Sequence, residues 1–330
     1  MAVEIAQVIK EKGRMFDWAD KVDNHKEMTK EDKDISQAVD MWAKDMGTYG
    51  DSADHKKDFA NFITKIVEPE VYNPDSMILQ KLFTEQDIGE FDEISLMEAP
   101  KNTLQAHEVA KGTNADKSYI DFSRGKVFRK FLQVETEIKY SDLRKGGYKS
   151  IATLSNYAVE ALNNEKFASV FNAIDSLITV PSNQGFSASG GLTMGVMDEA
   201  AGYVLDRGTD PILLGLSTDM RGVNRMTGYD AFYSENMKNA LNMNSILATY
   251  LGVPLATVNA SKKDGFGNTL LPQKKIFGIA EQIGGFSMIG GLRTYVTPDN
   301  NNEKYTLKFT GYEFTFNIIK PEKICKILIA

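Results

Sequence analysis

Two neighbouring stretches decide the fold: VFRKFLQVETEI at residues 127–138 and, after a Gly146-Gly147 break, IATLSNYAVEALNNEKFASVFNAIDSLI at residues 151–178. From Phe131 onward, odd and even positions of the first stretch fall on opposite faces of an extended strand. The second stretch carries apolar residues at spacings of three and four. It therefore predicts one long helix, whose apolar stripe includes Ile151, Leu154, Ala158, Leu162, Phe167, Phe171 and Ile174.

The predicted helix can run unbroken, because no proline lies between Lys145 and Val180. About 33 residues, each rising about 1.5 Å, make a rod of roughly 50 Å. Such a rod is about as long as an ordinary domain of this size is wide. The sequence thus predicts an elongated subunit, which is more typical of an assembly than of a lone enzyme.

The composition is that of a globular protein, with 330 residues, 42% hydrophobic and 25% charged. No apolar run approaches the roughly 18 residues that a membrane-spanning helix needs. The N-terminus lacks the apolar core of a signal peptide, so we expect a cytoplasm-like compartment. The single cysteine, Cys325, permits no intrachain disulfide, and we interpret it as a small apolar residue of a terminal strand.

The formal net charge is −7, and it is unevenly distributed. Residues 1–70 hold 11 Lys or Arg and 16 Asp or Glu, so five of the seven excess negative charges lie there. No domain-wide basic surface is available to bind nucleic acid by counter-ion release. An acidic protein repels DNA, which suits a container better than a binder.

Four further regions have distinct patterns. Residues 1–68 contain no proline, and we interpret them as short helices on a mobile or partner-dependent arm, with a small helical domain as the alternative. Residues 101–139 hold 8 Lys or Arg and 5 Asp or Glu around a turn at 112–116, which predicts a basic two-stranded ribbon. That ribbon is either a solvated hairpin or an arm on an acidic neighbour. Residues 192–300 mix helix and strand, with a helix expected over 233–251 and a strand over 288–296. Residues 304–330 alternate as strands.

Residues suited to chemistry are scattered. His25, His55 and His107 lie far from the one cysteine, so no zinc site or Cys-His pair is indicated. The glycine-rich stretches at 190–195 and 284–291 fit neither phosphate-binding template. The sequence therefore predicts no catalytic, cofactor-binding or metal site. An α/β enzyme of unknown class, with residues 192–300 as its active domain, stays open as an alternative.

The order of elements resembles the major capsid proteins of tailed double-stranded-DNA bacteriophages, whose Hong Kong 97-like fold is shared with encapsulins. Residues 133–138, followed by Ser141-Asp142-Leu143, are similar to the strand that feeds the long helix of that family. Residues 251–255 (LGVPL), followed by Ile276-Phe277-Gly278, are similar to its Leu-Gly-x-Pro and Phe-Gly pattern. The resemblance covers about residues 90–330 and implies an α+β fold.

In that fold, the resemblance implies six segments along the chain. They are an N-terminal helical arm at 1–74, a connection to the peripheral domain at 75–100, an extended β-hairpin loop at 101–139, the peripheral domain with its long spine helix at 140–181, an axial domain at 182–300, and closing strands of the peripheral domain at 301–330.

The function that the resemblance implies is structural and not enzymatic. The subunit would self-assemble as hexamers and pentamers into an icosahedral shell around packaged double-stranded DNA, without sequence-specific DNA binding. Scaffolding, portal and decoration proteins would be further partners, no membrane or cofactor would be involved, and the virion capsid would be assembled in the host cytoplasm. An encapsulin-like cellular nanocompartment is the alternative, because it shares the fold.

The resemblance also implies which residues contact neighbouring subunits. Cations of the extended loop are expected at those contacts, namely Lys111, Lys117, Arg124, Lys126, Arg129 and Lys130. In the axial domain, Lys262, Lys263 and Asp264 are expected on an exposed loop. One class of this family joins its subunits through a lysine on the extended loop and an asparagine of the neighbour. Lys111 and Lys117 lie near the expected hairpin tip and are candidates for such a lysine. Our default interpretation is that they are solvated lysines of a turn, without a covalent role.

Overall fold

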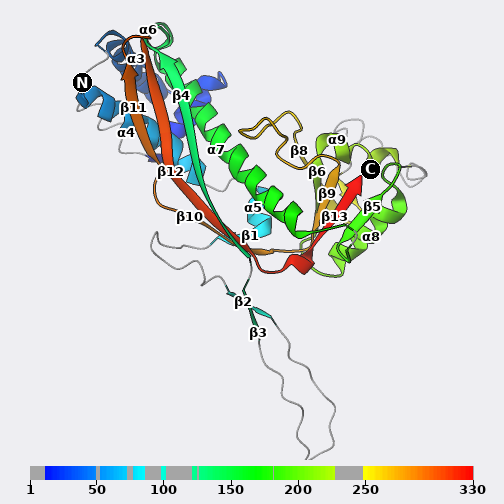
Figure 1. Cartoon of the computed structure of the whole chain (residues 1–330). Coiled ribbons are helices and arrows are strands. Elements are labelled where there is room, and N and C mark those ends of the chain that lie inside the picture. Colours follow the sequence, from blue (N-terminus) through cyan, green and yellow to red (C-terminus); the bar gives the residue numbers. More distant parts are fainter. Residues whose placement is uncertain are drawn as a thin grey trace, which may run out of the picture.

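The computed structural model describes residues 12–49, 53–72, 77–85, 98–101, 121–124, 126–180, 182–226 and 248–329. Figure 1 shows an elongated molecule, with one sheet and most helices at one end and a second sheet at the other. The long helix α7 (Tyr148–Leu177) runs between the two ends. Its 30 residues correspond to about 45 Å. The chain thus has the rod that the apolar stripe predicted.

The larger sheet has five strands built around β12 (Lys304–Ile318). One side of β12 pairs with β4 (Lys126–Lys139) along its whole length, and the other side pairs with β11 (Arg293–Asp299) and then β10 (Gly284–Ile289). The short strand β1 (Phe83–Glu85), which follows α5 (Met77–Leu82), lies parallel to β10. Strand β4 pairs only with β12 among the described strands, so it is an edge strand.

The register between β4 and β12 shifts between Phe309 and Tyr312. Gly311 lies at this irregularity with a φ of 85°, a conformation that glycine adopts without strain. A Cβ atom there would lie 2.6 Å from the carbonyl oxygen of Gly291. The bulge bends the longest strand of the sheet at the point where β11 gives way to β10 as its neighbour.

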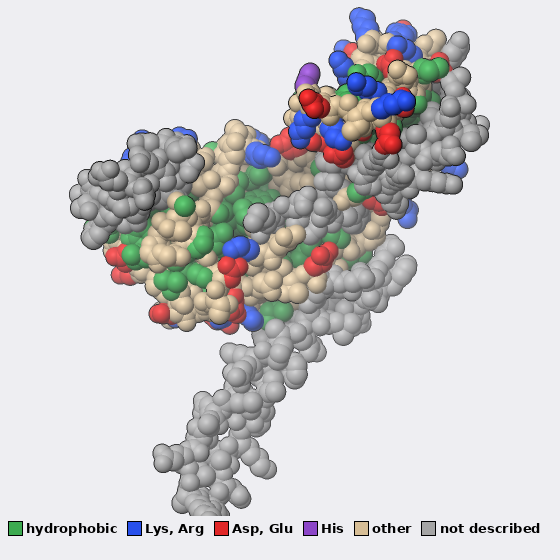
Figure 2. Space-filling model, turned by 180° about the vertical axis from the view of Figure 1, so that it is seen from behind, with side chains coloured by type: hydrophobic (Ala, Val, Ile, Leu, Met, Phe, Trp, Pro, Cys, Tyr) green, Lys and Arg blue, Asp and Glu red, His purple; other side chains and the backbone are tan. Residues whose placement is uncertain are grey.

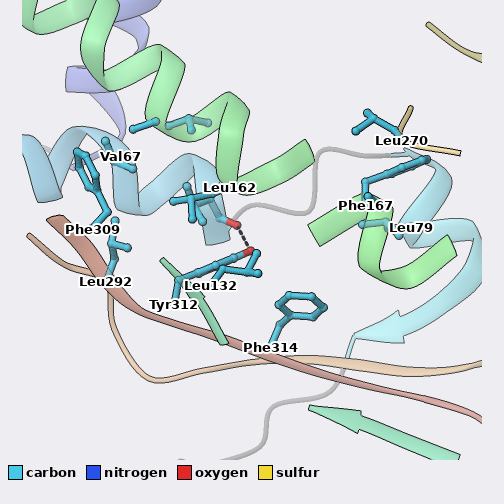
Figure 3. Packing of buried hydrophobic residues seen from close by; sticks show 14 of the residues in the cluster. Val67, Leu79, Leu132, Leu162, Phe167, Leu270, Leu292, Phe309, Tyr312 and Phe314 are labelled. Carbon is cyan, nitrogen blue, oxygen red and sulfur yellow. Dashed lines mark hydrogen bonds between the residues drawn. The ribbon is translucent and has the colours of Figure 1, made fainter. Parts of the chain in front are cut away.

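Helix α7 packs its predicted stripe against the sheet. All seven stripe residues belong to or pack on one buried hydrophobic cluster, and all except Leu154 are almost fully buried. Figure 3 shows Leu162 of α7 above Leu132 of β4 and Tyr312 of β12. The stripe therefore stabilises the subunit's own core, at about 25 cal/mol for each Å² of apolar surface removed from water.

The N-terminal helices α2 (Lys12–Asp23), α3 (Lys30–Tyr49) and α4 (Ala53–Tyr72) correct one interpretation. They are not short helices on a mobile arm, because two have 20 residues and their apolar side chains join the main core. Trp18 is fully buried beside the ring of Tyr148, and Phe59 is fully buried beside Tyr305. Tyr305 also donates a hydrogen bond to the carbonyl of Met46.

The second sheet has six strands in the order β5 (Gly185–Ala188), β13 (Ile324–Ile329), β9 (Lys275–Ile279), β6 (Ile212–Leu216), β8 (Val253–Val258) and β7 (Thr249–Tyr250). One face packs on the C-terminal half of α7, where Phe171 meets Phe277. The other face packs on α8 (Met194–Leu205). The short α9 (Ser217–Met220) and the 3₁₀ turns η2 (Val223–Arg225) and η4 (Pro321–Lys323) complete this end. Cys325 is buried in β13, as predicted.

Two expectations for this part of the chain need comment. The helix expected over 233–251 lies largely outside the described residues, and its last part is wrong, since Thr249 and Tyr250 form β7. The strand expected over 288–296 is two strands, β10 and β11, separated at Gly290-Gly291-Leu292. Glycines allow the sharp change of direction there, which alternation of side chains alone does not reveal.

The ribbon predicted over 101–139 is wrong for its last part, 126–139, and residues 102–120 lie outside the described residues. Strands β2 (Glu98–Lys101) and β3 (Asp121–Arg124) form an antiparallel pair that stands away from the main body in Figure 1. Strand β4 instead belongs to the five-stranded sheet throughout its 14 residues. Alternation identified β4 correctly as a strand but could not say which partner it pairs with.

Candidate subunit interface

A groove runs along the outer side of the molecule between edge strand β4 and helix α7. Residues 131–138 form one wall and residues 149–165 form the other. Residues 263–266, from the loop between β8 and β9, close one end. The two hollows that make up this β4–α7 groove share Val134, Tyr157 and Ala161, so they are continuous.

Three large aromatic side chains on the groove are unusually exposed. Phe131 of β4 is 57% exposed, Tyr157 of α7 is 65% exposed, and Phe266 at the loop tip is 86% exposed. All three line the same hollow. Apolar side chains gathered in one concave place, in contrast to single exposed ones, mark interaction surfaces. Beside them, β4 leaves one edge without a strand partner among the described residues, which is a template for pairing with another chain.

The charged side chains that line the groove are mostly acidic. Six carboxylates and two lysines line it: Glu135, Glu137, Asp142, Glu160, Glu165 and Asp264 against Lys149 and Lys263. This is the acidic surface that a basic arm would need on a neighbouring subunit. Figure 2 shows acidic and basic side chains intermingled over the end that holds α2 to α4, so no single sign dominates that face.

The loop between β8 and β9 reaches across to the helix. Lys262 Nζ lies 3.2 Å from Glu160 Oε1, and the backbone N–H of Gly265 donates to Glu165 Oε2 at 2.9 Å. The loop expected at Lys262, Lys263 and Asp264 is therefore an exposed loop, but it lies against α7. Asp264 organises the loop itself, because its carboxylate accepts the backbone N–H groups of Phe266 and Asn268.

The predicted cations of the extended loop fall into two groups, those whose side chains the structure does not describe and those that lie on β4. Lys111 and Lys117 lie outside the described residues, and the side chains of Arg124 at the end of β3 and Lys126 at the start of β4 are also not described. Arg129 and Lys130 lie on β4 in the main sheet, so assigning them to the extended loop is wrong. Arg129 pairs with Glu313 of its own β12.

Beneath the groove, the core contains a buried lysine. Lys166 of α7 is 3% exposed, and its Nζ donates to the carbonyl oxygen of Val71 at 3.2 Å. The hydroxyl of Tyr312 donates to the same oxygen at 3.1 Å (Figure 3). Burial lowers the pKa of Lys166 to about 8. These two donors hold the last turn of α4 against α7 and β12.

A second polar cluster joins α7 to the six-stranded sheet. The carboxylate of Asp175 lies 2.7 Å from Lys275 Nζ of β9 and 2.9 Å from Lys326 Nζ of β13. Burial by itself would raise the pKa of Asp175, but hydrogen bonds from both lysines outweigh it and lower the pKa. Lys326 also donates to the backbone carbonyl of Asp175 at 3.0 Å. The cluster fixes the end of α7 to the second sheet.

Features of reactive sites are sparse. Burial raises the pKa of Cys325 to about 12, so this thiol stays protonated and unreactive. Among the residues that the structure describes, no three His, Cys, Asp or Glu side chains are grouped as metal ligands. None of the helices in the same residues is long and apolar enough to cross a membrane.

The sequence did not identify Phe131 and Tyr157 as surface residues, whereas Phe266 directly follows the residues expected on an exposed loop. One signal was available for Phe131, which is the apolar member of the strand face that also carries Gln133, Glu135 and Glu137. Tyr157 lies outside the apolar stripe of α7, and Phe266 stands between two glycines. Only the fold brings these three positions to one groove.

Comparisons with known proteins agree on the family and the fold. A family profile described as "SPbeta prophage-derived putative capsid protein YonB" matches residues 12–327. No curated protein sequence matches the chain significantly. A solved structure from Gordonia phage Cozz is 12% identical with a TM-score of 0.52, and the match covers 77% of this chain and 85% of that one.

Two further structures are similar. One from Mycobacterium phage Ogopogo is 12% identical with a TM-score of 0.52, over 76% of this chain and 91% of that one. The holo-SrpI encapsulin complex from Synechococcus elongatus matches with a TM-score of 0.44 at 11% identity, over 78% of this chain and 88% of that one. The fold is the α+β, Hong Kong 97-like capsid fold. Because the profile spans nearly the whole sequence, the chain belongs to the YonB family of prophage-derived capsid proteins.

Proposed function

We propose that this protein is a major capsid protein whose copies assemble as hexamers and pentamers into an icosahedral shell around packaged double-stranded DNA. The observation that carries the proposal is the β4–α7 groove. It combines three exposed aromatic side chains with the open edge of a 14-residue strand. A lone soluble protein gains nothing from such a surface, whereas a subunit that buries it against a copy of itself gains hydrophobic contact and strand pairing.

The ring geometry of the proposal follows from the kind of contact that two different surfaces make. A projecting ribbon and a groove elsewhere on the subunit are different surfaces, so their contact is heterologous and closes into rings when the rotation allows. Rings of five and six are those that an icosahedral shell needs. We propose that the chain divides as the family implies, with α7 as the spine of a peripheral domain and the six-stranded sheet at the centre of an axial domain.

The proposed role is structural, without catalysis or a cofactor. The net charge of −7 favours a wall that does not adhere to the DNA it encloses. We infer that the shell forms in the host cytoplasm and becomes the capsid of the virion, with scaffolding, portal and decoration proteins as candidate partners. This last inference follows from membership of the family.

The test is the size and content of the purified particle. Sedimentation velocity of the protein expressed alone is expected to show a fast-moving shell species in addition to small oligomers. Particles from a producing lysate are expected to protect double-stranded DNA from added nuclease. A subunit that sediments only as a monomer under all assembly conditions, and that is absent from phage particles, would overturn the proposal.

A further inference from the structure

The loop between β8 and β9, residues 259–274, has a firm base and a rigid tip. At the base, Leu270 and Leu271 are buried in the main core. Towards the tip, Lys263 and Thr269 form a β-bridge. The Asp264 carboxylate accepts two backbone N–H groups of the turn, at 2.9 and 2.7 Å. The tip can therefore move as one piece, carrying Phe266 with it.

Only weak contacts hold this tip against α7. The ion pair between Lys262 and Glu160 has side chains 49% and 48% exposed. Exposed pairs of this kind contribute little to stability and are weakened by salt. The tip also contacts α7 through the hydrogen bond from Gly265 N–H to Glu165, which is exposed to solvent. The docked position of the tip is thus easily exchanged for an open one.

The position of the tip decides the shape of the groove. Four of the thirteen residues that line the first hollow, 263–266, belong to the tip. When the tip leaves α7, Phe266 departs from Phe131 and Tyr157, and one end of the groove opens. The tip belongs to a loop of the six-stranded sheet, whereas the other walls belong to β4 and α7. The groove is therefore complete only when the loop of the six-stranded sheet lies against β4 and α7.

The charges of the groove and its open strand edge indicate what fills it. Its lining has six carboxylates and two lysines. Residues 101–126 of the chain have five Lys or Arg and three Asp or Glu, so the ribbon begun by β2 and β3 is basic. A ribbon strand can add to the open edge of β4, since main-chain pairing supplies affinity and aromatic side chains supply anchors. A second copy of this chain supplies such a ribbon, so ribbons and grooves are present in equal numbers.

We propose that the tip of the β8–β9 loop is a movable wall that closes the β4–α7 groove on the basic ribbon of a second copy, so that loop docking and subunit contact are coupled. This inference rests on the proposed function, because it names the partner and the regulation of the same interface. The ribbon meets Phe266 in the groove only when the tip is docked, so the ribbon binds the docked state better and shifts the loop toward it. Docking in turn strengthens the ribbon's binding by the same factor.

Charge reversal tests the coupling. Lys262→Glu and Glu160→Lys each turn the ion pair into a repulsion, and each is expected to slow assembly roughly fivefold, measured by light scattering. The double variant restores the pair and is expected to recover the wild-type rate. Lys44→Glu is the matched control, because Lys44 pairs with Asp40 within α3, away from the groove. Hydrogen exchange of the unassembled variants is expected to show faster exchange at 262–268 and unchanged exchange at Leu270 and Leu271.

The identity of the occupant needs a second measurement. Shells grown from mixed ¹⁴N- and ¹⁵N-labelled subunits are treated with a carbodiimide, which joins a lysine directly to a carboxylate. The expected products are mixed-isotope links from ribbon lysines, including Lys111 or Lys117, to Glu135 or Asp142, two groove carboxylates that do not hold the tip. Shells that form at the wild-type rate in both single variants, or whose ribbon lysines link only elsewhere, would overturn this inference and leave the shell proposal intact. Failure of the wild-type protein to form any shell would overturn both.

Discussion

The buried amine of Lys166 permits a quantitative prediction about stability. Its pKa falls from 10.5 to about 8 on folding, because burial penalises the charged form. Below pH 8 the amine is charged in both states, so the folded protein carries the full cost of a buried charge. A difference of about 2.5 pKa units corresponds to about 3 kcal/mol. Replacing Lys166 with methionine removes that cost and keeps the volume filled.

The substitution also removes one hydrogen bond. Val71 keeps its bond from the Tyr312 hydroxyl, so no buried carbonyl is left without a donor. We allow about 1 kcal/mol for the lost bond. Lys166→Met is therefore expected to raise the free energy of unfolding by about 2 kcal/mol at pH 7.

The sign of the pH dependence follows from the lowered pKa. Between about pH 8 and 10.5, the unfolded chain binds more protons at this lysine than the folded chain does, so the wild-type stability rises with pH. The advantage of Lys166→Met is expected to shrink over this range and to become a deficit of about 1 kcal/mol above it, because only the lost hydrogen bond then remains. The difference between variant and wild type isolates Lys166 from other groups that titrate there.

The assay is urea unfolding, followed by the fluorescence of the two tryptophans, Trp18 and Trp42. Trp18 is buried beside Tyr148 at one end of α7. The measurement uses a Phe131→Ser background, which is expected to keep the subunits dispersed. Lys149→Met is the control, because Lys149 lies exposed on the same helix. A Lys166→Met variant that is less stable than wild type at pH 7, or a variant difference that stays constant from pH 7 to pH 10.5, would refute the reasoning.

Three further predictions concern the interface, the polar cluster and the bulge. Phe131→Ser is expected to abolish shell formation with unchanged circular dichroism, whereas Tyr295→Ser, an equally exposed aromatic on β11, should assemble normally; equal behaviour would exclude the groove as the interface. Asp175→Asn should cost about 2 kcal/mol in urea unfolding at pH 7, since two lysines lose their partner. The wild-type advantage should fade as the pH drops below 3.8, because the pKa of Asp175 is lowered by folding; an advantage that persists there contradicts the assignment. Gly311→Ala should lower the melting temperature more than Gly267→Ala does, because both glycines have positive φ but only the first faces a backbone carbonyl; equal losses would show that the close approach is unimportant.

The elements with strong periodicity could be predicted from the sequence. The stripe from Ile151 to Ile174 predicted α7, and the alternation from Phe131 to Ile138 predicted β4. Both patterns are local, because a helix or a strand with one buried face shows it within a few turns or residues. The buried Cys325 and the strand pattern of the last residues followed from the same kind of evidence.

The N-terminal helices were misjudged for a physical reason. Their apolar residues are separated by long charged stretches, so residues 1–68 resemble a solvated arm when considered alone. Trp18 and Phe59 are buried by Tyr148 and Tyr305, which lie far away in the sequence. Burial that depends on distant partners leaves no local signal. Phe131 is the converse case, since an aromatic residue in an alternating strand looks like a core residue, but it remains exposed.

The most direct test of the central claim is a negative-stain electron micrograph of the purified, concentrated protein. The account predicts closed, uniform, icosahedral shells built from this chain, and their loss in the Phe131→Ser variant. A field of dispersed single subunits in the wild-type sample, under conditions that favour assembly, would contradict the account.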